Sequence, residues 1–273
     1  MIDTNVNAER AAVYLPIPGE ADHKYTRGTV LLITGSEKYP GAGVLSAGGA
    51  SYGGAGMVRF GGSDRSADLV LQRFPEVVLS LSASDSLVVG SGWGQDLRDA
   101  AQAAVAAHRG PLVVDAGALP LFASHDGGAA VTVLTPHPGE ARQLWADLNL
   151  PGGYPDVPAV AAQRLSQATG AIVVLKAATT AVSDGTTTLR YRAKTAWPGV
   201  AGAGDVLSGL LGSVLARHCK LGGNDWVQAA GAAVWLHGEA GALAAGVGEA
   251  ATHPMRASDI VKSLPAAWDT VPR

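Results

Sequence analysis

The sequence contains little charge, few aromatic residues and almost no cysteine. Of its 273 residues, 16% are charged and 5% are aromatic, and Cys219 is the one cysteine. A single cysteine excludes a disulfide within the chain and is compatible with a reducing cytosol. Lys and Arg number 20 against 23 Asp and Glu, for a net charge of −3, and neither sign forms a block. Binding to the phosphates of nucleic acid needs a basic face, so we expect no nucleic-acid partner.

Long hydrophobic runs are also missing, although hydrophobic residues make up 47% of the chain. No run reaches the roughly 20 residues that a membrane-spanning helix needs. The opening residues MIDTNVNAER lack the basic and apolar regions of a signal peptide. We therefore expect a cytoplasmic protein with no membrane contact. Because the chain shows no internal repeat and no linker, a single domain over residues 1–273 is expected.

Short β-branched runs alternate with helix-forming stretches along most of the chain. Strands are expected over residues 29–35, 57–60, 76–80, 86–90, 111–117, 130–136 and 171–180. Helices are expected over 96–110, 139–148, 157–170, 205–217 and roughly 224–246, and a hairpin over 181–191. The glycine-rich stretch 40–56 is expected to be helical only if its small side chains let it pack closely against the sheet. The alternation predicts an α/β fold with a mostly parallel sheet, in which ligands bind at the carboxyl ends of strands.

The glycine-rich stretch VAGAGDVLSG, residues 200–209, leads directly into an amphipathic helix. Gly202 and Gly204 let the backbone turn tightly, and the free N–H groups at a helix start attract anions, phosphate above all. Asp205 then has two interpretations. It is a helix N-cap, or it is a general base that accepts the proton of an attacking hydroxyl beside the anion site. The combination of glycines and acid favours the general base.

Two familiar nucleotide-binding motifs are excluded by their spelling. A dinucleotide fingerprint would need glycine at Gln95 in GSGWGQD and at Leu207 in GAGDVLSG. Neither stretch carries the Gly-Lys-Ser/Thr ending of a P-loop.

Other polar residues follow apolar strands and allow two interpretations each. In TPHPGE, residues 135–140, His137 is pinned between two prolines, so it either caps a loop or grips a ligand. Lys176 either reaches the surface or meets a phosphate beside a threonine hydroxyl. Asp115 is a catalytic helper or a turn residue. His237 is interpreted as a helix residue whose hydrogen bonds are satisfied.

The order of these motifs resembles that of the ADP/ATP-dependent NAD(P)H-hydrate dehydratases, over nearly the whole chain from about His23. The motifs that carry the resemblance are GSEKYPGAGVLSAGGA, VVDAGAL, TPHPGE, VLKAATT, and AGAGDVLSG followed by AVWLHG. TPHPGE together with GAGDVLSG is the specific part. The resemblance implies a ribokinase-like fold, with a central, mostly parallel sheet and helices on both faces.

The resemblance also implies a reaction. Members repair NADHX and NADPHX, hydrated nicotinamide cofactors that cannot carry hydride, by phosphorylating the ring hydroxyl. Phosphate then leaves and NADH or NADPH is restored. ADP, giving AMP and phosphate, is the expected donor, with ATP as the alternative, and Mg²⁺ is expected by analogy with other phosphoryl transfers. A homotetramer and a separate NAD(P)HX epimerase in the same pathway are further expectations.

Site residues are carried over from the resemblance position by position. Asp205 is implied as the base on the ring hydroxyl and as a contact of NAD(P)HX. The other residues implied to contact NAD(P)HX are Ala42, Gly92 and His137. The residues implied to contact the adenine nucleotide are Gly204 and the AMP-holding segment Lys176, Ala177, Ala178, Thr179 and Thr180. No metal ligand is identified.

Two departures from the family pattern bear on the nucleotide side. Ala177 stands where the family has glycine, and the loop 196–201 differs from the family's spelling, which alters backbone contacts around the site but not the base. The first alternative function is a vitamin-precursor kinase of the same superfamily, which shares the glycine–aspartate element but need not carry TPHPGE. The second, a non-catalytic nucleotide-binding protein, has no reason to keep Asp205 beside an anion site.

Overall fold

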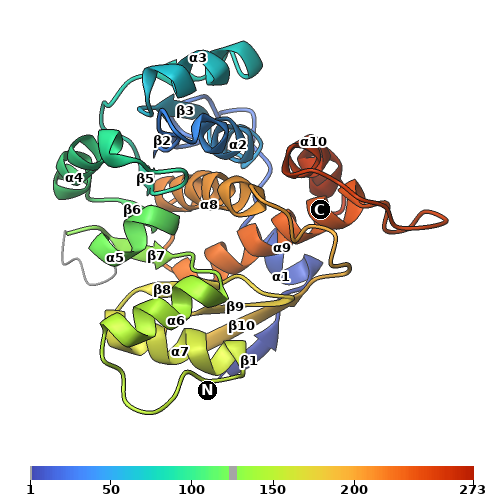
Figure 1. Ribbon diagram of the computed structural model, residues 1–273. Coiled ribbons are helices and arrows are strands. Elements are labelled where there is room, and N and C mark those ends of the chain that lie inside the picture. Colours follow the sequence, from blue (N-terminus) through green and yellow to red (C-terminus); the bar gives the residue numbers. More distant parts are fainter. Residues whose placement is uncertain (1, 123–127) are drawn as a thin grey trace.

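The structure is a computed structural model that describes residues 2–122 and 128–273 (Figure 1). Within these residues, one 10-stranded sheet has the order β1-β10-β9-β8-β7-β6-β5-β2-β3-β4. The strands are β1 (Ile2–Asn5), β2 (Thr29–Ile33), β3 (Met57–Phe60), β4 (Val78–Leu79), β5 (Ser86–Val89), β6 (Pro111–Val114), β7 (Val131–Leu134), β8 (Ile172–Leu175), β9 (Thr179–Ser183) and β10 (Thr187–Arg192).

The helices connect these strands and cover the sheet. They are α1 (Ala8–Ala12), α2 (Pro40–Ser51), α3 (Asp64–Arg73), α4 (Arg98–Ala107), α5 (Leu119–Phe122), α6 (Pro138–Asp147), α7 (Pro158–Thr169), α8 (Ala203–Lys220), α9 (Trp226–Ala244) and α10 (Ala257–Trp268). Among the described residues, no helix has the length and hydropathy needed to cross a membrane.

The sheet is mostly parallel, as the sequence predicted. From β4 across to β8, every neighbouring pair runs parallel. At the other edge, β9 runs antiparallel to β8 and β10, and β1 pairs parallel with β10. All five residues of β2 are buried, because helices cover both faces of a parallel sheet.

Two hydrophobic cores lie on the two faces of the sheet, since successive side chains of a strand point to opposite faces. Val30 and Leu32 of β2 belong to the core that includes α2, α8, α9 and α10. Leu31 and Ile33 belong to the core that includes α4, α6 and α7. Figure 1 shows α9 and α7 on opposite sides of the strands β8, β9 and β10. Helices on both faces are therefore confirmed.

Helices α2 and α8 approach each other to backbone contact through glycines. A Cβ added at Gly49 would lie 2.1 Å from the Val206 carbonyl oxygen, and one at Gly209 would lie 1.9 Å from the Ser46 oxygen. The glycine-rich stretch 40–56 thus forms a helix, as predicted, but its closest neighbour is α8 rather than the sheet. This packing fixes the start of α8 relative to β2 and β5.

The prediction of a single strand over residues 171–180 is wrong. β8 ends at Leu175, and β9 returns antiparallel from Thr179. The hydroxyl of Thr180 donates to the Ala177 carbonyl at 3.1 Å, which closes a turn over residues 176–178. The turn leaves Lys176 at the carboxyl end of β8, next to the ends of β6 and β7.

The hairpin around Asp184-Gly185 is confirmed. Asp184 Oδ1 accepts from the backbone N–H groups of Thr186 at 2.9 Å and Thr187 at 2.7 Å, while Gly185 has a φ of +89°. No element was predicted from the sequence at β1, α1, α3, α5 or α10.

Candidate active site

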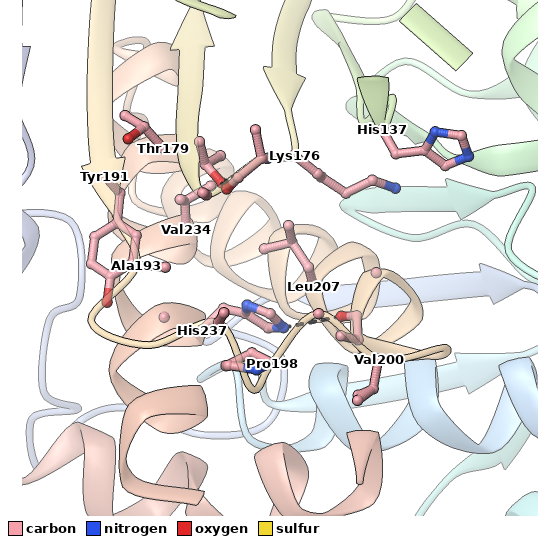
Figure 2. Close-up of a pocket in the computed structure, with 18 of the residues that line it drawn as sticks. His137, Lys176, Thr179, Tyr191, Ala193, Pro198, Val200, Leu207, Val234 and His237 are labelled. Atoms are coloured by element: carbon pink, nitrogen blue, oxygen red, sulfur yellow. Dashed lines mark hydrogen bonds between the residues drawn. The ribbon is translucent and has the colours of Figure 1, made fainter. Parts of the chain in front are cut away.

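A cavity of about 1000 Å³ opens where the carboxyl ends of β6, β7 and β8 meet the first turn of α8. The predicted residues that line it are His137, Lys176, Ala177, Ala178, Thr179, Thr180, Gly204 and Asp205. Figure 2 shows His137 and Lys176 at one end of the cavity, and Tyr191 and His237 toward the other. Ligand sites in α/β sheets lie at strand ends, as here.

The first turn of α8 begins on a glycine. Gly202 is the N-cap residue, with a φ of +90°, and no described side chain caps the helix. Because Asp205 is the third residue of the helix, its interpretation as the N-cap is wrong. The first N–H groups of α8 have no side-chain acceptor and line the cavity, which suits the binding of an anion.

Asp205 is an acid held in a form that accepts protons near neutrality. The pKa of this carboxyl is raised to about 7, chiefly by burial and in smaller part by the negative charge of Asp115, while the Lys176 ammonium opposes the rise. A group that titrates near the working pH is suited to general-base catalysis. Asp205 therefore combines a position beside the anion site with the proton affinity of a base.

Asp115 is buried directly after β6, with 2% of its surface exposed. Its Oδ1 accepts from Thr135 Oγ1 at 2.6 Å and from Lys176 Nζ at 2.8 Å, and its Oδ2 accepts from Ser91 Oγ at 2.8 Å. Three donors compensate the buried charge, as buried carboxylates require. Its interpretation as a simple turn residue is therefore incomplete.

Lys176 is charged despite its burial. Burial disfavours its ammonium, but the charge of Asp115 and the hydrogen bond to it outweigh burial and leave the pKa of Lys176 above its ordinary value. A Cβ added at Gly204 would lie 3.2 Å from Lys176 Nζ, so the ammonium lies directly against the first turn of α8. Positive charge and helix N–H groups converge at this end of the cavity.

His137 is the N-cap of α6. Its Nδ1 accepts from the backbone N–H groups of Gly139 at 3.0 Å and Glu140 at 3.2 Å, while its own backbone N–H donates to Glu140 Oε2 at 2.8 Å. With Nδ1 used as an acceptor, the ring hydrogen lies on Nε2. The side chain is 57% exposed, and Nε2 lies 3.6 Å from Glu140 Oε1, beyond hydrogen-bond distance, so the Nε2–H has room to donate to a ligand. Capping and ligand binding are thus compatible.

The two threonines of the AMP-holding segment differ in what their hydroxyls do. Thr180 Oγ1 accepts from the Ala177 N–H at 3.4 Å and donates to the Ala177 carbonyl, so it shapes the turn. Thr179 lies at the start of β9 and lines the cavity. The turn forms with Ala177 in the place where the family pattern has glycine.

Ala42 and Gly92 lie apart from the other predicted residues. Within the described part of the chain, neither lines the cavity, but they contact each other: a Cβ at Gly92 would lie 2.4 Å from the Ala42 Cβ. Gly92 has a φ of +63° and follows Ser91, whose hydroxyl bonds to Asp115. The pair therefore adjoins the cavity through the Asp115 hydrogen bonds.

The far end of the cavity was missed from the sequence. It is lined by Tyr191, Pro198, Val234 and His237. His237 Nε2 bonds to the Ala203 carbonyl at 3.0 Å, and burial chiefly lowers the pKa of His237 to about 4, so the ring is neutral. No local sequence pattern predicts that these residues line one cavity, because β10 and α9 meet only in the folded chain.

The fold and cavity together define the class: a ribokinase-like α/β protein with a site suited to phosphoryl transfer. The chain belongs to the NAD(P)H-hydrate dehydratase family, whose model matches residues 30–265. The family match agrees with the resemblance carried by TPHPGE and GAGDVLSG.

Three known proteins illustrate the likeness. The chain is 36% identical to the bifunctional NAD(P)H-hydrate repair enzyme Nnr of Mycobacterium leprae, over 96% of this chain and 56% of that protein. It is 34% identical to the ADP-dependent (S)-NAD(P)H-hydrate dehydratase of Neisseria meningitidis serogroup B, over 81% and 78%. The crystal structure of the ADP/ATP-dependent dehydratase of Bacillus subtilis, co-crystallized with ATP/Mg²⁺, is 25% identical, with a TM-score of 0.81 over 96% of each chain. The chain spans about half the length of the curated bifunctional relatives.

Proposed function

We propose that this chain restores NADH and NADPH from NADHX and NADPHX by ADP-dependent dehydration. The observation that carries the proposal is the position of Asp205. Its carboxyl, with the pKa raised to about 7, lies on the first turn of a helix whose N–H groups are not capped by any described side chain, and the Lys176 ammonium lies against the same turn. Base and anion site are thus side by side, as phosphoryl transfer to a hydroxyl requires.

The proposed first step makes one bond and breaks one. The ring hydroxyl oxygen attacks the β-phosphorus of ADP while Asp205 takes the hydroxyl proton. The bond from this phosphorus to the oxygen shared with the α-phosphate breaks, and AMP leaves. Lys176 and the N–H groups at the start of α8 stabilise the negative charge on the transferring group.

The proposed second step is elimination. The carbon–oxygen bond of the phosphorylated ring breaks, and phosphate leaves with the oxygen. Loss of a proton from the neighbouring ring carbon then restores the double bond of the reduced nicotinamide. Both steps are redox-neutral, so ADP is the only co-substrate required.

The two ligands are assigned to neighbouring sets of residues that meet at the start of α8. We assign the adenine nucleotide to Gly204 and to Lys176 through Thr180, which line the cavity together. We assign the hydrated nicotinamide to His137 and Asp205, with Ala42 and Gly92 beyond the Asp115 hydrogen bonds. His137 Nε2–H supplies a donor to that ligand.

Magnesium is assigned to the nucleotide rather than to a protein cage. Among the described residues, no three His, Cys, Asp or Glu side chains cluster in a way that would hold a metal. Mg²⁺ normally needs only one or two carboxylates together with water and phosphates. Glu140, with 24% of its side chain exposed, lines the cavity and provides such a carboxylate, while Asp205 stays free to act as the base. When bound, the ion neutralises charge on the phosphate oxygens.

The wider expectations also belong to this proposal. We propose a single domain, a homotetramer, and an epimerase of the same repair pathway supplied by another chain or domain. Light scattering on the purified chain tests the tetramer.

The direct test is a repair assay. NADHX is mixed with the protein and ADP, ATP or no nucleotide, and the absorbance of reduced nicotinamide is followed. The proposal predicts recovery with ADP, release of AMP and phosphate in equal amounts, and no recovery without nucleotide. The vitamin-precursor kinase predicts the opposite: a stable phosphorylated alcohol and no returning absorbance. Family membership favours the dehydratase.

A further inference from the structure

Asp115 is a buried acid that the proposed mechanism does not use. Its three donors, Ser91, Thr135 and Lys176, follow the ends of β5, β7 and β8, while Asp115 itself follows β6. One carboxylate therefore joins the carboxyl ends of four neighbouring parallel strands. At 2% exposure, both of its oxygens are committed to protein donors rather than to a ligand.

The hydrogen bonds continue from Asp115 into α8. Ser91 Oγ, whose hydrogen goes to Asp115, lies 2.8 Å from Ser208 Oγ, and Ser208 Oγ lies 2.9 Å from the backbone carbonyl of Asp205, so the single Ser208 hydrogen serves one of these two acceptors at a time. A continuous chain of polar groups thus connects the buried carboxylate to the helix turn that carries the base. Such networks fix the relative position of their members more rigidly than single contacts do.

Lys176 has three carboxylates within electrostatic reach: Asp115, Glu140 and Asp205. It bonds to Asp115, at 2.8 Å. Replacing one partner of a buried ion pair leaves the other charge uncompensated, which favours its pairing with another opposite charge nearby. Without Asp115, the ammonium would therefore pair with Asp205 or Glu140.

We infer that Asp115 is a positioning residue: it holds Lys176 Nζ against the first turn of α8 and keeps this ammonium from pairing with the base Asp205. The inference rests on the proposed function of the same site. One buried carboxylate thus both fixes the position of the Lys176 ammonium and keeps the Asp205 carboxyl unpaired.

The test is Asp115→Asn in the full chain. An amide carries no charge to hold Lys176, and displacement of a catalytic group by about 1 Å costs on the order of 100-fold in rate, so we expect kcat to fall by that order. The acid limb of the pH–rate profile should also move to lower pH. In the parent protein the charge of Asp115 raises the pKa of Asp205, so removing that charge lowers this pKa. A Lys176 ammonium that moves toward Asp205 would lower the pKa of Asp205 again.

The other charged and titratable groups facing this site stay in place in the variant. They are Glu140 of α6, its N-cap residue His137, the neutral His237 of α9, and the β10 side chains Tyr191 and Arg192 with the following Lys194. A shift of the acid limb is therefore attributable to Asp115 and Lys176.

Thr135→Val is the matched control. It removes one hydrogen bond from the same carboxylate but leaves its charge and its bond to Lys176. We expect a smaller loss of kcat and an acid limb that stays in place. If Asp115→Asn folds, as circular dichroism will show, but behaves like Thr135→Val, the positioning role is wrong.

A crystal structure of Asp115→Asn separates this inference from the proposed function. The inference predicts Lys176 Nζ displaced from Gly204 toward Asp205 or Glu140, and weaker ADP binding by calorimetry, whether or not the parent repairs NADHX. An unmoved Lys176 with unchanged ADP affinity would overturn the inference. A parent protein without repair activity would overturn the proposed function alone.

Discussion

The two ends of the cavity are built from different parts of the fold and differ in charge. Asp115 and Lys176 follow parallel strands, and with Asp205 at the start of α8 they form an end that holds two acids and a cation. Tyr191 on β10 and His237 on α9 line the other end, here called the His237 end, where the imidazole is neutral. Its charged lining residues are cations, Arg192 and Lys194, and Lys194 pairs with Glu239 beside Tyr191. The first end of the cavity thus holds the groups proposed to take the proton and bind the phosphates, and the other end holds the rings of Tyr191 and His237.

The difference follows from how each end is packed. Parallel strand ends bring polar side chains of separate strands to one edge, where they share hydrogen bonds. The far end depends on small residues of α9: a Cβ at Gly238 would lie 2.1 Å from the Tyr191 ring, and one at Gly241 would lie 2.9 Å from Pro198. Close packing of rings on a helix gives a surface suited to a planar, largely apolar group.

The largest expected effect is at the charged end. Asp205→Asn should lower kcat by roughly 10²–10⁴-fold, because the variant cannot accept the hydroxyl proton. ADP binding, measured by calorimetry, should persist, since the helix N–H groups and Lys176 remain. Asp64→Asn, an exposed acid in the first turn of α3, is the control and should leave kcat unchanged. If Asp205→Asn turned over at the parental rate, Asp205 would not be the general base.

The pH dependence of turnover should also report the charged end. The pKa of Asp205 is raised to about 7, so the carboxylate form is lost as pH falls below that value. We expect kcat/KM, which reports the free enzyme, to fall about tenfold per pH unit below pH 7. The pKa of His237 is about 4, so this residue should contribute no transition between pH 5 and 8. A profile flat down to pH 5 would mean that no such base operates.

A methyl group at the start of α8 should affect anion binding. Gly204→Ala places a Cβ 3.2 Å from Lys176 Nζ, where the transferring group must approach. We expect the KM for ADP to rise about tenfold, the equivalent of a lost charge-assisted hydrogen bond. Gly19→Ala, where a Cβ meets nothing within 4 Å, is the control. Equal KM values for the two variants would place the phosphates elsewhere.

The smallest expected effect is at the His237 end. His237→Phe loses the hydrogen bond to the Ala203 carbonyl but keeps the ring shape. We expect the KM for ADP to rise several-fold, by roughly the value of one hydrogen bond, with kcat and the acid limb near their parental values. His237→Gln, whose amide retains a donor, should recover part of the loss. A displaced acid limb in either variant would contradict the separation of the two ends.

The sequence predicted the end around Asp205 and Lys176 better than the His237 end. Gly204, Asp205, Lys176 and His137 stand in short motifs whose local structure places them at strand or helix ends. The turn at 176–178 could not be predicted, because Ala177 and Ala178 are not typical turn residues and the β-branched threonines continue the strand pattern. Its consequence, that the AMP-holding segment spans two strands, required the structure.

Long-range pairings explain what the sequence left open. Asp115 has two interpretations in sequence, since its donors lie at least 20 residues away in the chain. The interpretation of His237 as a helix residue with satisfied hydrogen bonds is confirmed, but its partner Ala203 lies 34 residues earlier and could not be named from the sequence. Periodicity predicts which face of an element is buried, but not which distant polar group will meet it.

The most direct measurement follows the oxygen of the ring hydroxyl. NADHX prepared with ¹⁸O in that hydroxyl is converted in the presence of ADP, and the released phosphate and water are analysed by mass spectrometry. Transfer of a phosphoryl group beside Asp205 predicts one labelled oxygen in every phosphate. Label recovered in water, with unlabelled phosphate, would show that the hydroxyl leaves without being phosphorylated and would contradict the mechanism.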